Sequence, residues 1–275
     1  MDLSQRSAAE TDGAAASPPL LTIDGACATI RLNRPAHLNR IQREDIGVIT
    51  THLERIEHDR TIRALVLTGT GRAFSAGYDL GDLARQAASP AAEIPATADA
   101  PSFEAMVDCL ENVRVPTIAR LNGSVYGGST DLALACDFRI GVAGMEMFMP
   151  AARLGLHYYR GGVVRYVSRL GPAAARKLFL TAARIDADEM LRIGYLDELV
   201  TAEQFDERVN ALAATLAGLA PLAVQGLKRT INEIARNELD GPAADARHRA
   251  SLRSDDIKEG AAAFAEKRRP HFKGR

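Results

Sequence analysis

The alternation of apolar and polar positions near the start of the chain predicts a β-hairpin. Residues 20–23 and 26–32 form two strand-like runs, and the pair Asp24-Gly25 between them is a common turn sequence. From residue 42 to about residue 58 the pattern changes, because apolar side chains recur at three- and four-residue steps. That period is typical of an amphipathic helix with one buried face.

Two later segments share one plan, in which a buried strand leads through a glycine-containing loop towards a helix. Residues 64–69 form an apolar run that is followed by a loop over 70–77. Residues 117–123 form a second run, followed by a loop over 124–128 and an apolar helix from about 129 to 136. A third strand is predicted over 138–143. The plan of strand, loop and helix therefore occurs twice.

The last third of the chain follows a helical pattern. Spaced apolar residues predict helices over 172–181, 186–193, 202–219 and 221–237. Pro172 and Pro221 stand in the first turns of two of these helices, where proline is favoured. The β-rich units therefore come first along the chain and the helices last.

The same pattern divides the chain into regions. Residues 1–18 are mostly small and polar and cannot repay their ordering entropy by burial, so we expect a disordered tail. Residues 87–101 are rich in alanine and proline with little periodicity, which is typical of a mobile surface loop. We place a core domain over 19–200 and a helical C-terminal region over 201–275.

Composition narrows the classes of function. Among 275 residues, 34 basic side chains balance 35 acidic ones, which argues against nucleic acid as a main partner because a phosphate backbone requires a basic face. The chain shows neither a signal-peptide pattern nor an apolar stretch of roughly 18 residues, so we expect no membrane association. Three cysteines at spacings that suit neither disulfides nor zinc indicate a cytoplasmic location. The spacing of the six histidines does not fit a metal site either.

Two short motifs suggest chemistry that their surroundings do not support. Gly69-Thr70-Gly71 begins like a dinucleotide-binding loop, but the third glycine that this fingerprint requires is Phe74. Residues 73–77 resemble the nucleophile elbow of serine hydrolases with its first glycine replaced by alanine. Ser75, however, lies well beyond the end of the preceding strand instead of directly after it. A serine hydrolase therefore stays as a minor alternative.

A pair of glycines at a strand-to-helix junction is more informative. Gly127-Gly128 lets the backbone approach a ligand closely, and a helix that begins there points its unpaired N–H groups at that ligand. The junction Gly77-Tyr78 in the preceding unit can supply a second N–H, and two such donors can stabilise a developing negative oxygen. Equally, the glycines can form only a tight turn, with Asp131 interacting with the helix dipole.

Four separated motifs then occur in one order along the chain. They are Leu32-Asn33-Arg34-Pro35 with Asn39, Ala73 to Leu80, Asn122-Gly123 through Gly127-Gly128 to Cys136-Asp137, and Phe264 to Arg275. Together they resemble the crotonase, or enoyl-CoA hydratase/isomerase, superfamily, and the resemblance runs from about Leu20 to Arg275. It implies an α/β fold, a crotonase-like spiral of repeated ββα units with a helical C-terminal trimerisation region. It also implies a homotrimer, or a hexamer formed as a dimer of trimers.

The resemblance implies a coenzyme A thioester as the substrate, with no metal, no redox cofactor and no permanently bound cofactor. The backbone N–H groups of Tyr78 and Gly128 would hold the thioester oxygen as it becomes an enolate. The implied coenzyme A contacts are Leu38, Arg40 and Ala76 along the groove, with Phe264 and Lys267, from this subunit or a neighbour, at the nucleotide end. A basic C-terminal cluster suits phosphates, although a solvated basic tail has the same composition.

The chain departs from the hydratase pattern at two acidic positions. Hydratases of this family use two glutamates, so that one activates water and the other handles the proton at the α-carbon. This chain has Asp131 at the first position and Ala151 at the second. Tyr158 matches a tyrosine of the decarboxylase branch, although the histidine of that branch is replaced by Tyr78. We take Asp131, Tyr158 and the neighbouring His157 as the polar groups that face the reacting carbons.

Three functions follow from these residues. The first is an acyl-CoA enzyme that acts through an enolate and is classed as an enoyl-CoA hydratase, with Tyr78, Gly128, Asp131 and Tyr158 as its catalytic residues. The second is an isomerase or decarboxylase of the same family, since one proton donor or none is enough once the enolate is held. The third is a catalytically weak acyl-CoA-binding protein, which the missing second acid suggests.

Overall fold

The computed structural model describes residues 17–82 and 101–275. The predicted tail over 1–18 lies outside these ranges except for its last two residues, and the predicted loop over 87–101 lies outside them except for Pro101. Ser17 is joined to the body of the molecule, because its backbone N–H donates to the Asn33 carbonyl at 3.0 Å.

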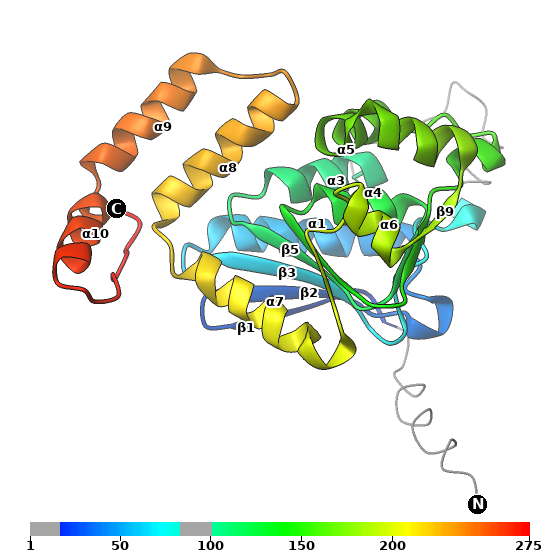
Figure 1. Cartoon of the computed structure of the whole chain (residues 1–275), viewed down its shortest axis with the longest axis horizontal. Helices are drawn as coiled ribbons and strands as arrows, with labels where there is room; N and C mark the ends of the chain where they lie inside the picture. Colours follow the sequence, from blue (N-terminus) through cyan, green and yellow to red (C-terminus); the bar gives the residue numbers. More distant parts are fainter. Residues whose placement is uncertain (1–16, 83–100) are drawn as a thin grey trace, which may run out of the picture.

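A six-stranded sheet forms the centre of the molecule (Figure 1). Its strands, in spatial order, are β1 (Leu20–Asp24), β2 (Cys27–Leu32), β3 (Ala64–Gly69), β5 (Thr117–Leu121), β7 (Phe138–Val142) and β10 (Glu198–Val200). β1 and β2 pair antiparallel about the turn at Asp24, which confirms the predicted hairpin. All the other pairs in this sheet are parallel.

A second, four-stranded sheet was not predicted. It consists of β4 (Ala73–Ser75), β6 (Ser124–Tyr126), β8 (Glu146–Phe148) and β9 (Arg184–Asp186). The prediction of loops over 70–77 and 124–128 was wrong at β4 and β6, because three residues are too few to show a strand period. β3, β5 and β7 belong to the large sheet, and the strand after each belongs to the small one. This repeat is the predicted spiral.

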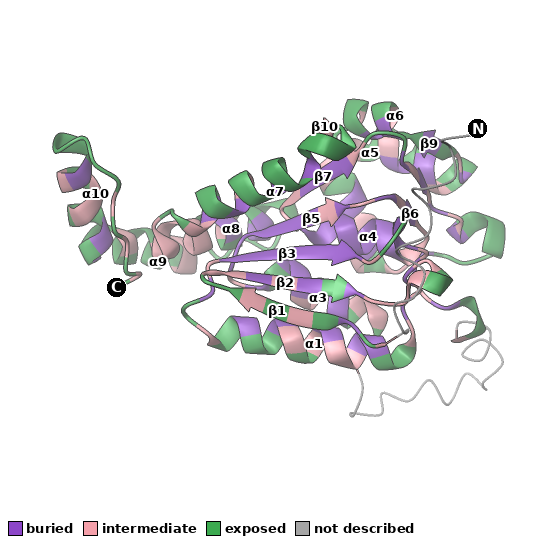
Figure 2. Ribbon diagram, turned by 90° about the horizontal axis from the view of Figure 1, so that it is seen from below, coloured by how far each residue is buried: buried purple, intermediate pink, exposed green. Residues whose placement is uncertain are grey.

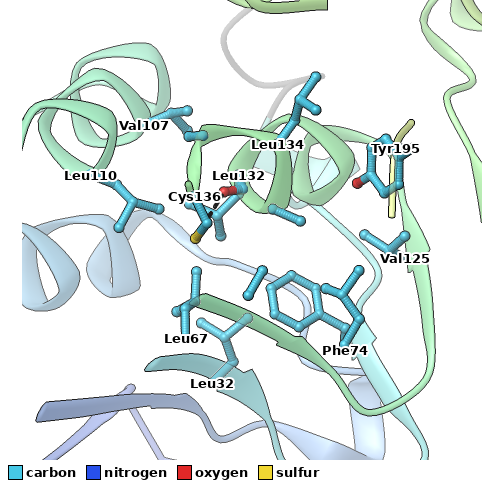
Figure 3. Close-up of a cluster of buried hydrophobic side chains, with 14 of the residues drawn as sticks. Leu32, Leu67, Phe74, Val107, Leu110, Val125, Leu132, Leu134, Cys136 and Tyr195 are labelled. Carbon is cyan, nitrogen blue, oxygen red and sulfur yellow. Dashed lines mark hydrogen bonds between the residues drawn. The ribbon is translucent and has the colours of Figure 1, made fainter. Parts of the chain in front are cut away.

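Helices cover both faces of the large sheet. α1 (Arg43–His58), α3 (Phe103–Asn112) and α4 (Gly128–Ala135) lie on one face, and α7 (Ala202–Ala217) lies on the other (Figure 2). Figure 3 shows side chains from α3 and α4 packed over Leu32 and Leu67 of the sheet. β3 is buried on both faces, which explains its uninterrupted apolar sequence.

The first half of α5 (Arg160–Thr181) is an element that the pattern did not reveal. Only residues 172–181 were predicted as helix, whereas the structure continues the helix back to Arg160 through a bend at Gly171. α6 (Ala187–Arg192) follows, and Asp186 caps it by accepting a hydrogen bond from the Glu189 N–H at 2.9 Å. α5 packs against α3 and α4, so its first half lies beside the glycine junction at the start of α4.

The helices at the C-terminus differ in where they pack. α7 buries Phe205, Val209 and Leu216 against the sheet, so it belongs with the core even though the predicted division falls at residue 200. α8 (Pro221–Ala235), α9 (Gly241–Arg253) and α10 (Asp255–Ala265) extend away from the sheet (Figure 1).

The membrane prediction can be compared only with the described helices. Among them, no single helix is long and apolar enough to cross a membrane. One pair, Ala202–Gly218 with Pro221–Ala235, reaches that length and composition together, but its two helices are bent by 107°.

Candidate active site

Two loops meet backbone to backbone at the ends of β4 and β6. Gly77 adopts a φ of +86°, in the left-handed region that favours glycine. A Cβ atom at Gly77 would lie 2.5 Å from the Tyr126 carbonyl oxygen and 2.8 Å from the Gly128 nitrogen, so no side chain fits there. The structure therefore brings together the two glycine-containing junctions that the sequence analysis singled out.

The backbone around this meeting point brings the nitrogens of Tyr78 and Gly128 into one region. Ile41 donates its N–H to the Gly77 carbonyl at 2.8 Å and accepts from the Asp79 N–H at 3.0 Å. Because successive N–H groups of an extended chain point to opposite sides, the intervening Tyr78 N–H points away from Ile41. Gly128 is the first residue of α4, where N–H groups have no acceptor within the helix. A Cβ atom at Gly128 would lie 3.6 Å from the Tyr78 nitrogen.

Asp131 lies three residues into α4, on the same side of the helix as Gly128. Its side chain is fully buried, and its Oδ2 atom accepts from Arg165 Nη1 at 2.7 Å and from the Tyr159 hydroxyl. The other oxygen, Oδ1, is buried without a hydrogen-bond partner among the described residues. Burial raises the pKa of Asp131 above its usual value, although Arg165 and Tyr159 act in the opposite direction. The arrangement satisfies one carboxylate oxygen and leaves the other buried without a partner in the described part of the chain.

Tyr158 adds a second buried polar atom beside this carboxylate. Its hydroxyl makes no hydrogen bond within the described part of the chain. Burial, followed by the charge of Asp131, raises the pKa of Tyr158 well above its usual value, so the phenol keeps its proton at neutral pH. A Cβ atom at Gly162 would collide with the Tyr158 ring and lie 3.0 Å from Asp131 Oδ2. Gly162 therefore makes the space that the ring and the carboxylate share.

Aromatic rings connect the N–H groups to the carboxylate. The Phe103 ring centre lies 5.7 Å from that of Tyr78 and 6.3 Å from that of Tyr159, and the Tyr159 ring lies 4.3 Å from that of Tyr158. A Cβ atom at Gly128 would come within 3.0 Å of the Phe103 ring. The site thus has apolar walls, two backbone donors and one carboxylate, a combination suited to a substrate whose oxygen becomes negative.

Comparison with known proteins identifies the family that carries this site. The family model described as enoyl-CoA hydratase/isomerase matches residues 22–275. The chain belongs to the enoyl-CoA hydratase/isomerase family.

Similar proteins extend over nearly the whole chain. A crotonyl-CoA hydratase of Syntrophomonas wolfei is 31% identical over 249 residues, covering 89% of this chain and 94% of the relative. A carnitinyl-CoA dehydratase of Proteus mirabilis is 34% identical over 262 residues, covering 93% of this chain and 98% of the relative. The crystal structure of an enoyl-CoA hydratase from Bacillus anthracis superposes with a TM-score of 0.83 at 26% identity, covering 94% of this chain and all of that one. The enoyl-CoA hydratase/isomerase fold predicted from the motifs is confirmed.

The residues expected along the coenzyme A groove of this family lie beside Tyr78. The Ala76 N–H donates to the Leu38 carbonyl at 2.7 Å, and Leu38 has a left-handed backbone with φ of +50°. The Arg40 side chain pairs with Asp79 at 2.8 Å. Leu38, Arg40 and Ala76 therefore lie on two backbone segments that are joined next to Tyr78. Their contact with coenzyme A stays a prediction.

Phe264 and Lys267 lie elsewhere in the subunit. Phe264 lies in the last turn of α10, and Lys267 follows that helix. Figure 1 shows α10 and α5 at opposite sides of the molecule. Phe264 is 88% exposed, so the described residues leave most of its side chain uncovered. Arg268, from the predicted basic cluster, is already paired with Glu259 at 2.6 Å. Within one subunit these residues do not join the site, and only the alternative of a neighbouring subunit stays open for them.

Three other expectations can be compared with the geometry. Ala151 is buried and supplies no acid, as its side chain requires. His157 is exposed and its place facing the reacting carbons stays a prediction, whereas the chain after the turn at Gly155 buries Tyr158. Ser75 is fully buried, donates to the Asn39 carbonyl at 2.8 Å and accepts from the Gly77 N–H at 3.0 Å. That hydroxyl is engaged in two hydrogen bonds of the Gly77 loop, which disfavours it as the nucleophile of a serine hydrolase.

The metal prediction is compared with the described residues alone. Over 17–82 and 101–275, no group of three or more His, Cys, Asp and Glu side chains is arranged to hold a metal ion. The absence of a cofactor stays a prediction.

Sequence reasoning did not find Phe103, Arg165 or the role of Tyr159. Phe103 begins α3, whose apolar residues Met106, Val107 and Leu110 do have a helical spacing. A helix prediction there was therefore possible. The contact between Arg165 and Asp131 joins residues 34 positions apart and leaves no local pattern.

Proposed function

We propose that this protein acts on acyl-CoA thioesters through an enolate, and that hydration of a 2-enoyl-CoA is its reaction. The observation that carries the proposal is the close approach of the Tyr78 and Gly128 backbones, with Gly128 three residues before a buried carboxylate that has one oxygen without a partner among the described residues. Two donors held by the backbone stabilise an oxyanion without reorganisation, which is often the largest single contribution to catalysis.

In this proposal Asp131 and Tyr158 divide the proton transfers. Asp131 Oδ1 takes a proton from water as the water oxygen bonds to the β-carbon, and the π electrons move to the thioester oxygen. The resulting enolate oxygen accepts hydrogen bonds from the Tyr78 and Gly128 N–H groups. The α-carbon then takes the proton of the Tyr158 hydroxyl, and Asp131 returns its proton to the phenolate. The phenol of Tyr158 is protonated when the cycle begins, as a donor must be, although its raised pKa makes it a weaker acid, so this transfer relies on the basicity of the enolate α-carbon.

Hydration can be tested with crotonyl-CoA by following the loss of the absorbance of the conjugated thioester. We expect turnover by the native protein and a decrease of about 10²- to 10⁴-fold in Asp131→Asn, because a general base contributes that much. Asp197→Asn is a matched control, since it removes a carboxylate that pairs with Arg139 on the surface side of β7. A native protein that turns over crotonyl-CoA no faster than Asp131→Asn would refute hydration.

A second candidate is an isomerase or decarboxylase with the same enolate. Ala151 favours it, because a reaction that needs one proton donor or none does not require the missing acid. Incubation with malonyl-, methylmalonyl- and 3-enoyl-CoA thioesters, followed by mass spectrometry, distinguishes loss of carbon dioxide from a shift of the double bond. Tight binding without conversion of any thioester would instead support the catalytically weak acyl-CoA-binding protein.

We also propose that the working unit is a homotrimer or a hexamer, and that Phe264 and Lys267 contact coenzyme A bound to a neighbouring subunit. Exposed apolar side chains line one side of α8, at Leu227, Ile231 and Ile234. Such a stripe favours burial against another copy. Light scattering measures the assembly, and a monomer with full activity would contradict this proposal.

A further inference from the structure

Arg165 is the most deeply buried cation in the described part of the molecule. Its side chain has no exposed surface and contacts three carboxylates, namely Asp131 at 2.7 Å, Asp108 at 2.6 Å and Glu111 at 3.2 Å. Two more arginines reach the last two of these: Arg169 contacts Glu111 at 3.1 Å, and Arg236 of α8 contacts Asp108 at 2.8 Å and also Glu111. We call these six residues the ionic cluster.

The three carboxylates of the ionic cluster differ in how many arginines contact them. Asp108 and Glu111 each contact a second arginine, whereas Arg165 is the only cation that contacts Asp131 among the described residues. Without Arg165, Asp131 would retain the Tyr159 hydroxyl as its one hydrogen-bond partner. A fully buried carboxylate that loses its cation takes up a proton instead of staying charged. The loss of Arg165 therefore acts most strongly on Asp131.

Arg165 also decides which oxygen of Asp131 is available. Arg165 Nη1 and the Tyr159 hydroxyl both donate to Oδ2. Tyr159 is the N-cap of α5, and Arg165 lies in the second turn of that helix. Holding Oδ2 on one side leaves Oδ1 as the oxygen that can accept a proton. A guanidinium suits this role because its planar fork bonds Asp131 through one nitrogen and Asp108 through another.

We propose that Arg165 is a positioning residue, which keeps Asp131 ionised and turns its Oδ1 atom towards the substrate. This inference rests on the proposed role of Asp131 as the base. Other groups that influence the charge of Asp131 are Glu111 from α3, the hydroxyls of Tyr158, Tyr159 and Tyr166 around α5, and Tyr195. None of these is a cation, so Arg165 alone favours the ionised form by charge.

The pH dependence of turnover tests the proposal. Asp131 must be deprotonated to act as a base, so kcat/KM decreases as pH falls through its pKa. In Arg165→Met we expect this acidic limb to move up by about one pH unit or more, the size of shift that an adjacent opposite charge produces. Arg165→Lys keeps a cation but loses the fork, so its limb lies between those of Arg165→Met and the native protein.

Two further variants keep the test decisive. Tyr159→Phe removes the other partner of Oδ2 without removing any charge of the ionic cluster, and it shifts the limb in the same direction even where Arg165→Met does not fold. Arg236→Gln is the matched control, since it removes an arginine from the ionic cluster that does not contact Asp131. We expect the acidic limb of the kcat/KM profile of Arg236→Gln to lie at the same pH as that of the native protein. The positioning role would be overturned if Arg165→Lys and Tyr159→Phe reduced turnover but left the pH of the acidic limb of kcat/KM unchanged.

A direct titration separates this inference from the proposed function. In protein labelled with ¹³C at the aspartate carboxyl groups, the NMR signal missing from Asp131→Asn belongs to Asp131, and its pH dependence gives the pKa without substrate. If crotonyl-CoA is not converted, the proposed function fails while this titration still measures the effect of Arg165. An Asp131 signal that titrates identically in the native protein and Arg165→Lys would overturn the inference even in an active enzyme.

Discussion

The two halves of the candidate site are built from different kinds of atoms, one from the main chain and the other from side chains. The backbone half consists of the Gly77-Tyr78 and Gly127-Gly128 junctions. Their main chains lie so close together that a Cβ atom at Gly77 would be 2.8 Å from the Gly128 nitrogen. The side-chain half consists of Asp131, Tyr158, Tyr159 and Arg165. The first half matches the family's motifs, whereas the second departs from the two-glutamate pattern of hydratases at Asp131 and Ala151.

This difference shows which part of the chemistry depends on residue identity. A backbone N–H is the same whatever side chain follows it, so the oxyanion-binding half needs only glycines that permit the approach. The acid–base half changes with every substitution, because the reach and pKa of its groups belong to the side chains. The same fold can therefore keep the enolate and change what happens to its protons.

The largest decrease in activity is expected from a substitution in the backbone half. Gly128→Pro removes one of the two N–H donors, and we expect kcat/KM to decrease by about 10²- to 10³-fold, as when one oxyanion donor is lost. Proline is tolerated at the first position of a helix, but its Cβ atom would lie 3.0 Å from the Phe103 ring, so we also expect a lower thermal midpoint and compare activities at a temperature where the variant is folded. Steady-state kinetics and a thermal melt measure the two quantities.

A matched proline tests whether that loss is specific. Ala202→Pro places proline at the first residue of α7, after Thr201 with an extended backbone that suits a residue before proline. We expect it to keep full activity. Retained activity in Gly128→Pro as well would refute the proposed oxyanion hole.

A smaller effect sharpens the side-chain half. Tyr158→Phe removes a buried hydroxyl that has no hydrogen-bond partner among residues 17–82 and 101–275, so we expect unchanged or slightly higher stability together with a decrease in turnover of about 10²-fold. Tyr166→Phe is the control, because it removes a buried hydroxyl that bonds Thr130 and should cost about 1 kcal/mol of stability. Turnover by Tyr158→Phe equal to that of the native protein would exclude this phenol as the proton donor.

The smallest effect concerns Ser75, which touches the backbone half only through Gly77. Ser75→Ala removes two hydrogen bonds from a buried loop, and we expect a loss of about 1–2 kcal/mol of stability with most of the activity kept. Urea unfolding and kinetics check both values. Complete loss of activity in a folded Ser75→Ala would return the serine hydrolase to consideration.

Much of the fold follows from local patterns. The hairpin, α1, β3 and β5 all lie where alternation, helical spacing or an apolar run placed them. The Gly127-Gly128 junction was equally visible, because two glycines before an apolar helix are a local signal. The small sheet was missed because its three-residue strands are stabilised by pairing with strands that lie far along the chain.

The sequence by itself determined the family, the spiral, and the positions of Asp131, Ala151 and Tyr158. Those properties depend on residue types and on short separations along the chain, and both can be read from the sequence alone. Only the tertiary structure decided that Arg165 and Tyr159 hold one oxygen of Asp131 and that Ser75 is a structural hydroxyl. Burial and ion pairing are set by residues brought together from distant segments, and the pKa values of the site depend on those contacts.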